Sequence, residues 1–338
     1  MNTEYDNIEL EHGGGGAKSN DLIDQMRKIM KSVGTWENCD DDGAVFDLGK
    51  EKLVFTTDAY IVDPLFFPGG DIGKICMCGT INDLAMMGAK PIGIALSIVI
   101  EEGFSKKELF KIIKSIQMVS NESGVPVVTG DTKVIDRGKI DKIEITTAGV
   151  GLAKKIIPSG GMHPGDAVIV SGDLGEHTVA LLSERFGYKS KIKSDSKTLH
   201  KEIEEVGIYL NALKDPTRGG LAANLIEMAE KSKVKIVLDE QLLPYKKETI
   251  AIAELLGIDV FSFASEGRFV ASVAQKNAKK VLEILQAFSK EAKIIGVVEK
   301  PSRTTARSAE GRGLYVKTKL GTLRKIEMPR GKLVPRIC

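Results

Sequence analysis

Residues 72–100, IGKICMCGTINDLAMMGAKPIGIALSIVI, decide the fold class of this chain. The first part, Ile72–Gly88, is apolar on most sides of a helical projection, which predicts a helix buried nearly all round. The second part, Ile92–Ile100, is a short apolar run rich in branched residues, which predicts a strand. The two segments together predict a core built from helices and sheet. Asp83 interrupts the apolar helix, where a carboxylate is costly to bury without a partner.

The same patterns recur outward from this stretch in both directions. In the first half they predict strands Leu53–Thr57, Val125–Thr129 and Lys142–Leu152, and helices Asp21–Val33 and Ser105–Ser123. In the second half they predict strands Ala167–Ser171, Val234–Leu238, Arg268–Ala274, Ile294–Val298 and Gly313–Lys317, and helices Glu176–Phe186, Leu199–Leu213, Leu221–Lys231, Lys246–Leu256 and Asn277–Ser289. Because strands and helices mix without a regular strand–helix–strand alternation, the predicted class is α+β.

The loop-like stretch IIPSGGMHPG at 156–165 separates two halves of ordinary domain size. We therefore expect one domain at 1–155 and a second at 156–321. Residues 322–338 differ from both, because Pro329 and Pro335 oppose a helix and the basic side chains favour solvent. This stretch predicts a mobile tail, and its last residue is Cys338.

Composition excludes several classes of function. The 338 residues are 42% hydrophobic and 28% charged, a profile typical of soluble globular proteins. A net charge of only +2 lacks the basic excess of a nucleic-acid binder. We expect no membrane segment, because no run approaches about 20 apolar residues, and no signal peptide, because the first residues lack an apolar core. The four cysteines show no zinc or disulfide spacing, so a reducing, cytoplasmic location is expected.

A glycine-rich segment, His12–Ser19, precedes the first predicted helix. Glycines such as Gly14 and Gly15 at a helix start can turn backbone N–H groups toward a phosphate. Ala17 stands where a Walker A motif needs glycine, so this is not a P-loop. A flexible connector is an equally good interpretation of the composition alone.

Aspartates recur at the ends of the predicted strands. Asp42 and Asp58 lie at such positions, Asp83 follows Asn82 inside the apolar helix, and Asp131 opens the sequence Asp131-Thr132-Lys133. Carboxylate oxygens that converge from several strands suit Mg²⁺ on a nucleotide. Each aspartate taken singly is also an ordinary turn or cap residue.

Two later segments carry further candidates. In Asp215-Pro216-Thr217-Arg218-Gly219-Gly220 the arginine could reach a phosphate and the glycines permit close approach, although an ordinary helix start has the same spacing. Glu266 lies between two apolar runs and is a candidate base if buried, although a solvent-facing turn glutamate is the simpler alternative.

Taken in order, the segments of this chain resemble the hydrogenase maturation factor HypE family, within the AIR-synthetase (PurM-like) superfamily. The resemblance runs from about Ile8 to Cys338. The long run from Thr57 to Gly70, which contains DPLFFPGG, and the final Pro335-Arg336-Ile337-Cys338 are its most specific parts. The remaining matches are Glu11–Gly16, Cys78–Asp83, Val128–Val134, Asp215–Gly220 and Ala264–Gly267.

The resemblance implies a two-domain PurM-like fold in which the first domain binds ATP and pairs its sheet with that of a second copy in a homodimer. It further implies that a carbamoyltransferase partner, HypF, loads a carbamoyl group onto Cys338. The protein would then use ATP to dehydrate this thiocarbamate to a thiocyanate, and the cyano group would pass to iron on a HypC–HypD scaffold.

The resemblance also assigns roles to the candidates. Cys338 would be nucleophile and carrier, and Glu266 and Lys133 the catalytic groups; which of these two moves the proton stays open. Mg²⁺ would be held by Asp42, Asp58, Asp83 and Asp131. The other ATP contacts expected are Gly14, Gly15, Asn82, Thr132, Asp215 and Arg218.

Two alternatives remain at this stage. Another superfamily activity, such as thiamine-phosphate phosphorylation or selenophosphate synthesis, would use ATP without modifying Cys338. A non-catalytic adaptor with a basic docking tail would show no ATP turnover, and would leave the aspartate series without a purpose.

Overall fold

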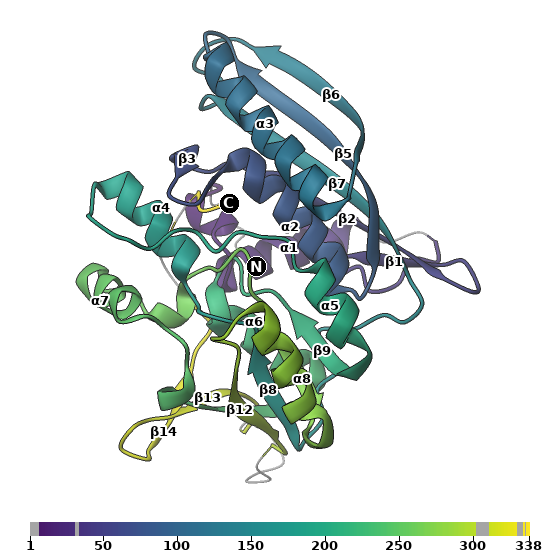
Figure 1. Cartoon of the computed structure of the whole chain (residues 1–338), viewed down its shortest axis with the longest axis vertical. Helices are drawn as coiled ribbons and strands as arrows, with labels where there is room; N and C mark the ends of the chain where they lie inside the picture. Colours follow the sequence, from purple (N-terminus) through teal and green to yellow (C-terminus); the bar gives the residue numbers. More distant parts are fainter. Residues whose placement is uncertain (1–6, 31–33, 302–310, 330–333, 335) are drawn as a thin grey trace, which may run out of the picture.

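The computed structural model describes residues 7–30, 34–301, 311–329, 334 and 336–338. Its described residues form two large β-sheets covered by helices, and one short two-stranded sheet, which confirms the predicted α+β class (Figure 1). The strands of the first half are β1 (Ala44–Asp47), β2 (Lys52–Tyr60), β3 (Phe66–Phe67), β4 (Gly70–Asp71), β5 (Lys90–Glu101), β6 (Val127–Ile135) and β7 (Ile143–Ala153). Its helices are α1 (Ala17–Ile29), α2 (Ile72–Met86) and α3 (Lys106–Ser123).

The first sheet has the strand order β1-β2-β7-β5-β6. Neighbours are antiparallel except β5 and β6, which are parallel and joined by α3. Strand β7 alternates buried and half-buried residues, so one face of the sheet is apolar. Helices α2 and α3 lie on that face (Figure 1), and β6 remains at the edge of the sheet.

Helix α2 is the predicted apolar helix and lies between the two domains. The side chain of Asp71 caps its start by accepting from the N–H of Lys74 at 3.0 Å. Every residue of the helix is buried except Lys74 and Asp83. A Cβ on Gly73 would lie only 2.5 Å from the carbonyl oxygen of Ile112, so glycine allows α3 to approach closely.

The second sheet has the order β14-β13-β10-β12-β8-β11-β9 and a separate core on each face. Helix α6 (Gly220–Ser232) packs on one face, and α5 (His200–Val206) and α8 (Gln275–Phe288) pack on the other. The remaining elements are α4 (Glu176–Phe186), α7 (Lys247–Leu256), β8 (Asp166–Val170), β9 (Leu210–Lys214), β10 (Lys235–Asp239), β11 (Val270–Ala274), β12 (Lys293–Glu299), β13 (Gly313–Lys317) and β14 (Leu323–Ile326). None of the helices in the described residues is long and apolar enough to cross a membrane.

Most predicted elements are present, and the exceptions have local causes. The predicted helix Leu199–Leu213 is wrong in its second half: the helix ends at Val206, Gly207 starts a short 3₁₀ turn, and β9 pairs with β11. The strand predicted at Val125–Thr129 instead begins at Val127 and continues to Ile135. The helix predicted at Asp21–Val33 begins four residues earlier, at Ala17, and its last predicted residues lie outside the described chain.

The predicted tail is also corrected at its start. Residues Leu323–Ile326 form β14, which pairs antiparallel with β13, because the alternating sequence Leu-Arg-Lys-Ile presents its last apolar side chain to the core of the second domain. The basic residues Arg324 and Lys325 are exposed, as expected. The segment beyond Ile326 returns to the first domain, where the side chains of Val334 and Ile337 are buried in its core.

Candidate active site

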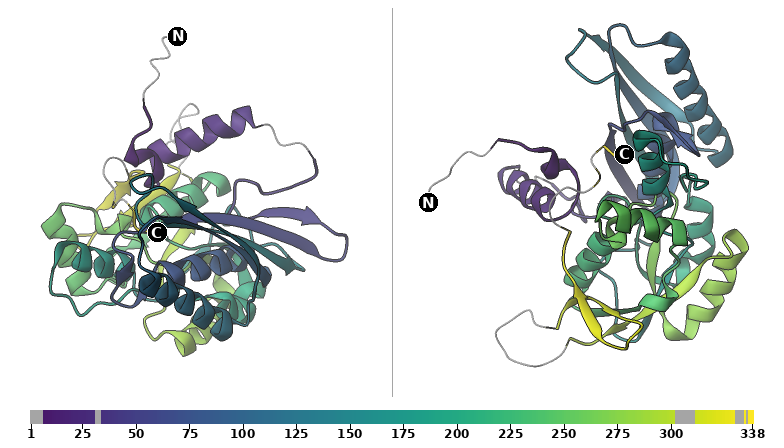
Figure 2. Two further views of the ribbon diagram at one scale, coloured as in Figure 1. Left: turned by 90° about the horizontal axis from the view of Figure 1, so that it is seen from above. Right: turned by 90° about the vertical axis from the view of Figure 1, so that its left-hand side faces the viewer.

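A cavity of about 430 Å³ lies where the two domains and the chain terminus meet, within the size range of small-molecule sites. Figure 2 shows the C-terminus between the two domains, with α1 beside it on the outer side. The cavity is lined by the end of β2, by α2, by the turn before α6, by the glycine-rich segment and by Cys338. Of the predicted residues it gathers Gly15, Asp42, Asp58, Asp83, Asp215, Arg218, Glu266 and Cys338.

Strand β2 builds one wall of this cavity by its alternation. Thr56, Asp58 and Tyr60 are two residues apart and therefore face the same side of the strand. The Thr56 hydroxyl donates to Asp83 on α2 at 2.9 Å, and the Tyr60 hydroxyl donates to Asp58 at 2.8 Å. We call the set Asp42, Asp58, Asp83 and Asp215 the acidic wall.

The acidic wall is electrostatically strained. Burial raises the pKa of Asp83, and the nearby charges of Asp58 and Asp215 raise it further. Burial and Asp42 raise the pKa of Asp215 to about 7, and burial likewise raises that of Asp58. Carboxylates packed this closely favour a bound cation, because a cation relieves both their repulsion and their lost hydration.

Lys214 is the cation that sequence reasoning missed. Its Nζ lies 2.5 Å from Asp42 and 4.0 Å from Glu227, and these charges hold its pKa above the ordinary value despite its burial. Its position directly before the Asp215 segment was the available signal. Tyr60 was missed as well, although its spacing of two residues from Asp58 on a predicted strand places it on the same face.

The glycine-rich segment lies against the turn that carries Arg218. A Cβ on Gly15, whose φ is +78°, would meet the backbone of Arg218 at 3.1 Å, so the approach depends on glycine. The guanidinium of Arg218 donates to the carbonyl of Gly13 at 3.4 Å. Gly13, Gly15 and Gly16 line the cavity, whereas the predicted Gly14 is not among its lining residues.

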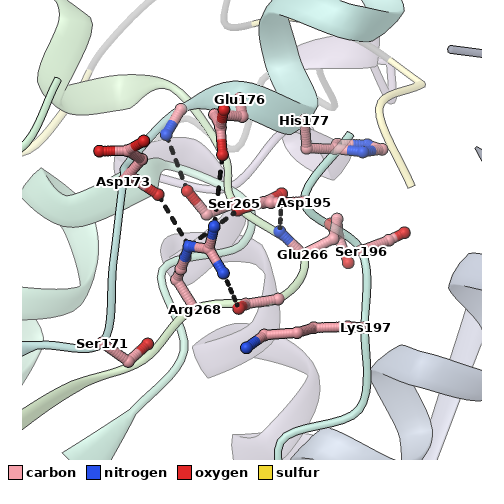
Figure 3. Close-up of polar contacts among 12 residues, drawn as sticks. Ser171, Asp173, Glu176, His177, Asp195, Ser196, Lys197, Ser265, Glu266 and Arg268 are labelled. Carbon is pink, nitrogen blue, oxygen red and sulfur yellow. Dashed lines mark hydrogen bonds and ion pairs between the residues drawn. The ribbon is translucent and has the colours of Figure 1, made fainter. Parts of the chain in front are cut away.

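Glu266 is held in the cavity by an ion cluster of Glu176, Asp195 and Arg268 (Figure 3). Its backbone N–H donates to Asp195 at 3.0 Å, and Arg268 lies 3.9 Å from the other oxygen of Asp195. A Cβ on Gly267 would overlap the carbonyl oxygen of Asp195, which explains a glycine directly after the glutamate. Ser265 accepts from the N–H of Gly175 at 2.8 Å. The segment Ser265–Gly267 is therefore fixed on both sides.

The Glu266 carboxyl suits the role of a base. It is only 3% exposed, and its Oε1 has no hydrogen-bond partner among the described residues. Burial raises its pKa well above the ordinary value, with further contributions from Asp215 and Asp195, while Arg218 opposes the rise. A carboxylate in such a place gains a proton readily, as a general base must.

Cys338 lies in the same cavity as Glu266 and Arg218. Burial raises the pKa of its thiol, Arg218 opposes this, and Glu266 and Asp58 add to it. A thiol in this position is protonated and a weak nucleophile at neutral pH. Arg336 does not activate it, because its guanidinium pairs with Asp141 at 2.6 Å.

Strand β6 does not bring its predicted residues to this cavity. Lys133 and Asp131 pair with each other at 2.8 Å, with side chains 69% and 62% exposed, and Thr132 donates its backbone N–H to Asp131. None of the three lines the cavity. Within one copy of the chain these residues lie away from the cavity, because β6 is the strand farthest along the sheet from β2. The catalytic role of Lys133 and the ATP and Mg²⁺ contacts of Asp131 and Thr132 therefore stay predictions.

Asn82 lies outside the cavity as well, so its predicted contact with the nucleotide stays a prediction. Its amide donates to the carbonyls of Lys197 at 3.0 Å and Glu266 at 3.3 Å, and its oxygen accepts from the N–H of Leu199 at 2.8 Å. It is buried and does not line the cavity. Asn82 therefore joins α2 to the second domain and supports Glu266.

The described residues contain no ready-made group of three His, Cys, Asp or Glu side chains in metal-binding geometry. The donor set of the acidic wall nevertheless suits a hard cation, because it offers only carboxylate oxygens, and burial and neighbouring charges raise the pKa of Asp83 and Asp215. Asp42, Asp58 and Asp83 fit the predicted ligand role on this ground, and Asp131 does not from the same copy.

Comparison with known proteins identifies the family. The model of the AIR synthase related protein N-terminal domain matches residues 40–153, and that of the C-terminal domain matches residues 163–308. The carbamoyl dehydratase HypE of Rhizobium leguminosarum bv. viciae is 40% identical, with 98% of this chain and 95% of that protein covered.

Two solved structures agree along nearly the whole chain. The structure of a HypE–HypF complex has a chain 37% identical to this one, with a TM-score of 0.82 over 91% of this chain and 99% of that one. A HypE structure in complex with ATP is 33% identical, with a TM-score of 0.81 over 98% of this chain and 100% of that one. On these matches, which extend over both domains, the chain belongs to the HypE family of AIR synthase related proteins.

Proposed function

We propose that this protein is a carbamoyl dehydratase that converts an S-carbamoyl group on Cys338 to S-cyanocysteine with ATP, and so supplies the cyanide ligand of a [NiFe]-hydrogenase. One observation carries the proposal: Cys338 shares a cavity with the buried carboxyl of Glu266 and with the acidic wall. The HypE relatives named carbamoyl dehydratase, and the one solved with ATP, support the same activity.

The acidic wall supports nucleotide binding through a metal ion. Asp42, Asp58 and Asp83 would hold Mg²⁺, which would neutralise the charge of the triphosphate. Arg218, Gly13, Gly15 and Gly16 line the cavity, and Arg218 and the backbone of the glycine-rich segment would bind phosphate oxygens. Lys214, which pairs with Asp42 and lines the cavity, would add a further positive charge near the triphosphate.

The reaction balances with these groups. The carbamoyl oxygen attacks the γ-phosphorus of ATP, the bond to ADP breaks, and one N–H proton is lost. The second N–H proton then leaves as the C–O bond breaks, giving the S–C≡N group and phosphate. Glu266 lies beside Cys338 with an unpaired oxygen, so it is the base for the nitrogen protons. Phosphorylation is needed because it replaces hydroxide, a poor leaving group, by phosphate.

The state of the thiol implies that loading occurs outside the cavity. In the cavity the Cys338 pKa is raised, so the free thiol is a poor nucleophile toward a carbamoyl donor. We infer that the terminal segment leaves the cavity to be carbamoylated by a HypF-type partner, as the HypE–HypF complex supports. It then returns for dehydration and leaves again to deliver cyanide to a HypC–HypD scaffold.

Strand β6 supports a homodimer in this scheme. It pairs with β5 on one side and with no strand of the described chain on the other, and every one of its residues is exposed, including Val128 at 61% and Val134 at 69%. Pairing with β6 of a second copy would cover these side chains. It would also carry Asp131, Thr132 and Lys133 away from solvent, so that they serve the cavity of the partner.

Intact-mass measurement tests the proposal. The full chain is incubated with HypF, carbamoyl phosphate and ATP, and the mass is followed in time. We expect the mass of one carbamoyl group to be added and then the mass of one water to be lost. The Cys338→Ala variant should show neither change. Modification of that variant like the parent would rule out the terminal carrier.

A further inference from the structure

The terminal residues of the chain lie in a defined seat on the first domain. The N–H of Ile61 donates to the carbonyl of Cys338 at 3.3 Å, and the N–H of Asp63 donates to the carbonyl of Arg336 at 3.2 Å. The two bonds join every second residue, so the backbone is held on both sides of Ile337, although Arg336, with φ +53°, is not extended.

Side chains complete the seat. Ile337 is 6% exposed and packs in the core of the first domain with residues of α2 and α4. Arg185 donates to the carbonyl of Arg336 at 3.0 Å and also to that of Asp63. The seat thus binds the backbone of residues 336–338 and one apolar side chain.

His177 makes the innermost contact with this segment. Its Nε2 lies 2.8 Å from the carbonyl oxygen of Ile337, and its Nδ1 lies 2.8 Å from the Ser194 hydroxyl. A carbonyl only accepts, so Nε2 carries the proton and Nδ1 accepts from Ser194. Burial lowers the pKa of His177 to about 4, and the ring therefore stays neutral at physiological pH. The Phe67 ring lies edge-on to it, with centroids 5.3 Å apart.

The helix turn that presents His177 is fixed by the same ion cluster that supports Glu266. Glu176, the preceding residue, lies 3.3 Å from Arg268, and Arg268 also lies near Asp195, which binds the N–H of Glu266. Figure 3 shows His177 and Glu176 on one turn of α4, with Arg268 below them and Glu266 on the adjacent segment. The position of the terminal segment and that of the base are therefore set by common contacts.

We propose that His177 is a positioning residue that holds Cys338 at the depth of Glu266 and sets the balance between the seated and the released terminal segment. The part concerning Cys338 and its seat needs no assumption about the reaction, whereas the consequence for catalysis rests on the proposed function. When the segment leaves, the buried N–H of His177 loses its acceptor, which favours return.

Alkylation of thiols in the full-length protein tests the seat without ATP or a partner. Iodoacetamide is added and the rate at each cysteine is read by peptide mass. Removing the donor in His177→Leu should speed alkylation of Cys338 about tenfold, as the loss of one buried hydrogen bond predicts. His177→Gln, which keeps an N–H near the same place, should restore much of the protection.

The other cysteines are internal controls. Cys39 is exposed and should react at the same rate in all variants, while Cys76 and Cys78 are buried and would react only if the fold were lost. His200→Leu changes a half-buried histidine at the start of α5, away from the described contacts of the terminal segment, and should leave Cys338 as protected as in the parent.

A second measurement joins the seat to the reaction. With HypF and carbamoyl phosphate, His177→Leu should be carbamoylated faster, because the thiol is released more often. With ATP, a single turnover of carbamoylated His177→Leu should be dehydrated more slowly, because Cys338 reaches Glu266 less often. A merely structural defect would slow both steps.

Unchanged alkylation of Cys338 in a folded His177→Leu protein would overturn the inference, whatever the chemistry. If His177→Leu speeds alkylation of Cys338 but the parent protein shows no dehydration, the inference about the seat holds and the proposed function is contradicted. If His177→Leu exposes Cys76 and Cys78, Arg185→Met gives the same test, since it removes the donors to Arg336 and Asp63 from the other side of the seat.

Discussion

Two regions of the first domain each carry an aspartate motif, but one region places its aspartates in the cavity and the other leaves its aspartate exposed to solvent. Strand β2 and helix α2 place the side chains of Asp58 and Asp83 in one cavity, where burial raises the pKa of both carboxyls. Strand β6 carries Asp131 and Lys133, which are exposed and pair with each other, so the pKa of Asp131 is lowered. The difference teaches that a motif fixes the chemistry of a site, while the place of its strand in the sheet decides which cavity the residues serve.

The largest effect is expected from a substitution in the cavity, at Glu266. Glu266→Gln keeps the shape of the side chain but removes the base, and should slow dehydration by at least about 100-fold. The carbamoylated form of Cys338 should accumulate in intact-mass spectra, because the HypF-dependent loading step does not use Glu266.

A matched variant separates loss of the base from loss of a buried charge. Glu202 is also buried, pairs with Lys197, and does not line the cavity. Glu202→Gln should therefore lower thermal stability without accumulation of the carbamoyl form. Normal dehydration by Glu266→Gln would remove Glu266 as the base.

Mixing two inactive variants tests whether β6 serves the partner copy. In the proposed homodimer, Lys133→Ala and Glu266→Gln would each damage both sites of their own dimer. A mixed dimer has one cavity with Glu266 from one copy and Lys133 from the other, so about a quarter of the parent activity should return on random exchange of subunits. Activity that stays at the level of the separate variants would mean that Lys133 serves no partner cavity.

The sequence predicted the regions whose pattern is local. The apolar helix at 72–88 and the strands around it follow from periodicity. Asp83, the carboxylate that interrupts this apolar helix, lies on α2 and lines the cavity. Glu266 and Arg218 were predicted as candidates with simpler alternatives, and only the burial of Glu266 separates it from a turn glutamate.

The rest depends on contacts distant in sequence. Lys133 follows Asp131 by two residues and Lys214 directly precedes Asp215, and nothing local shows that only Lys214 faces the cavity of its own copy. The terminal segment has the composition of a solvated tail, yet its seat is made by Ile61, Asp63 and His177 from two other parts of the chain. Such pairings leave no periodic signal in either partner.

A smaller effect is expected from a charge on the exposed strand. Val134 lies one residue before the end of β6 and is 69% exposed, so Val134→Asp should leave the monomer folded. In the proposed pairing it should weaken dimer formation about tenfold, because each copy would bring a charge into the covered edge. Sedimentation velocity over a range of concentrations measures the shift, and Lys139→Asp in the following turn is the control that should not change it.

The smallest predicted effect concerns the pH dependence of the dehydration rate. Glu266 works as a base only when ionised, so dehydration slows as the pH falls through its raised pKa. The charge of Asp195 contributes to that rise. In Asp195→Asn the amide oxygen can still accept from the N–H of Glu266, but the charge is gone. The pKa of Glu266 should then fall, and the acidic limb of the single-turnover rate should move to lower pH.

The control for this shift is Asp239→Asn, a cap residue of the second domain outside the cavity, which should leave the limb where it is. An unmoved limb in Asp195→Asn would mean that Asp195 is already protonated in the folded protein, as its own burial favours. A shift of the limb to higher pH would mean that Asp195 acts mainly by orienting Glu266 toward Arg218. The charge of Arg218 lowers the pKa of Glu266, and this effect would weaken if the substitution moved Glu266 away from Arg218.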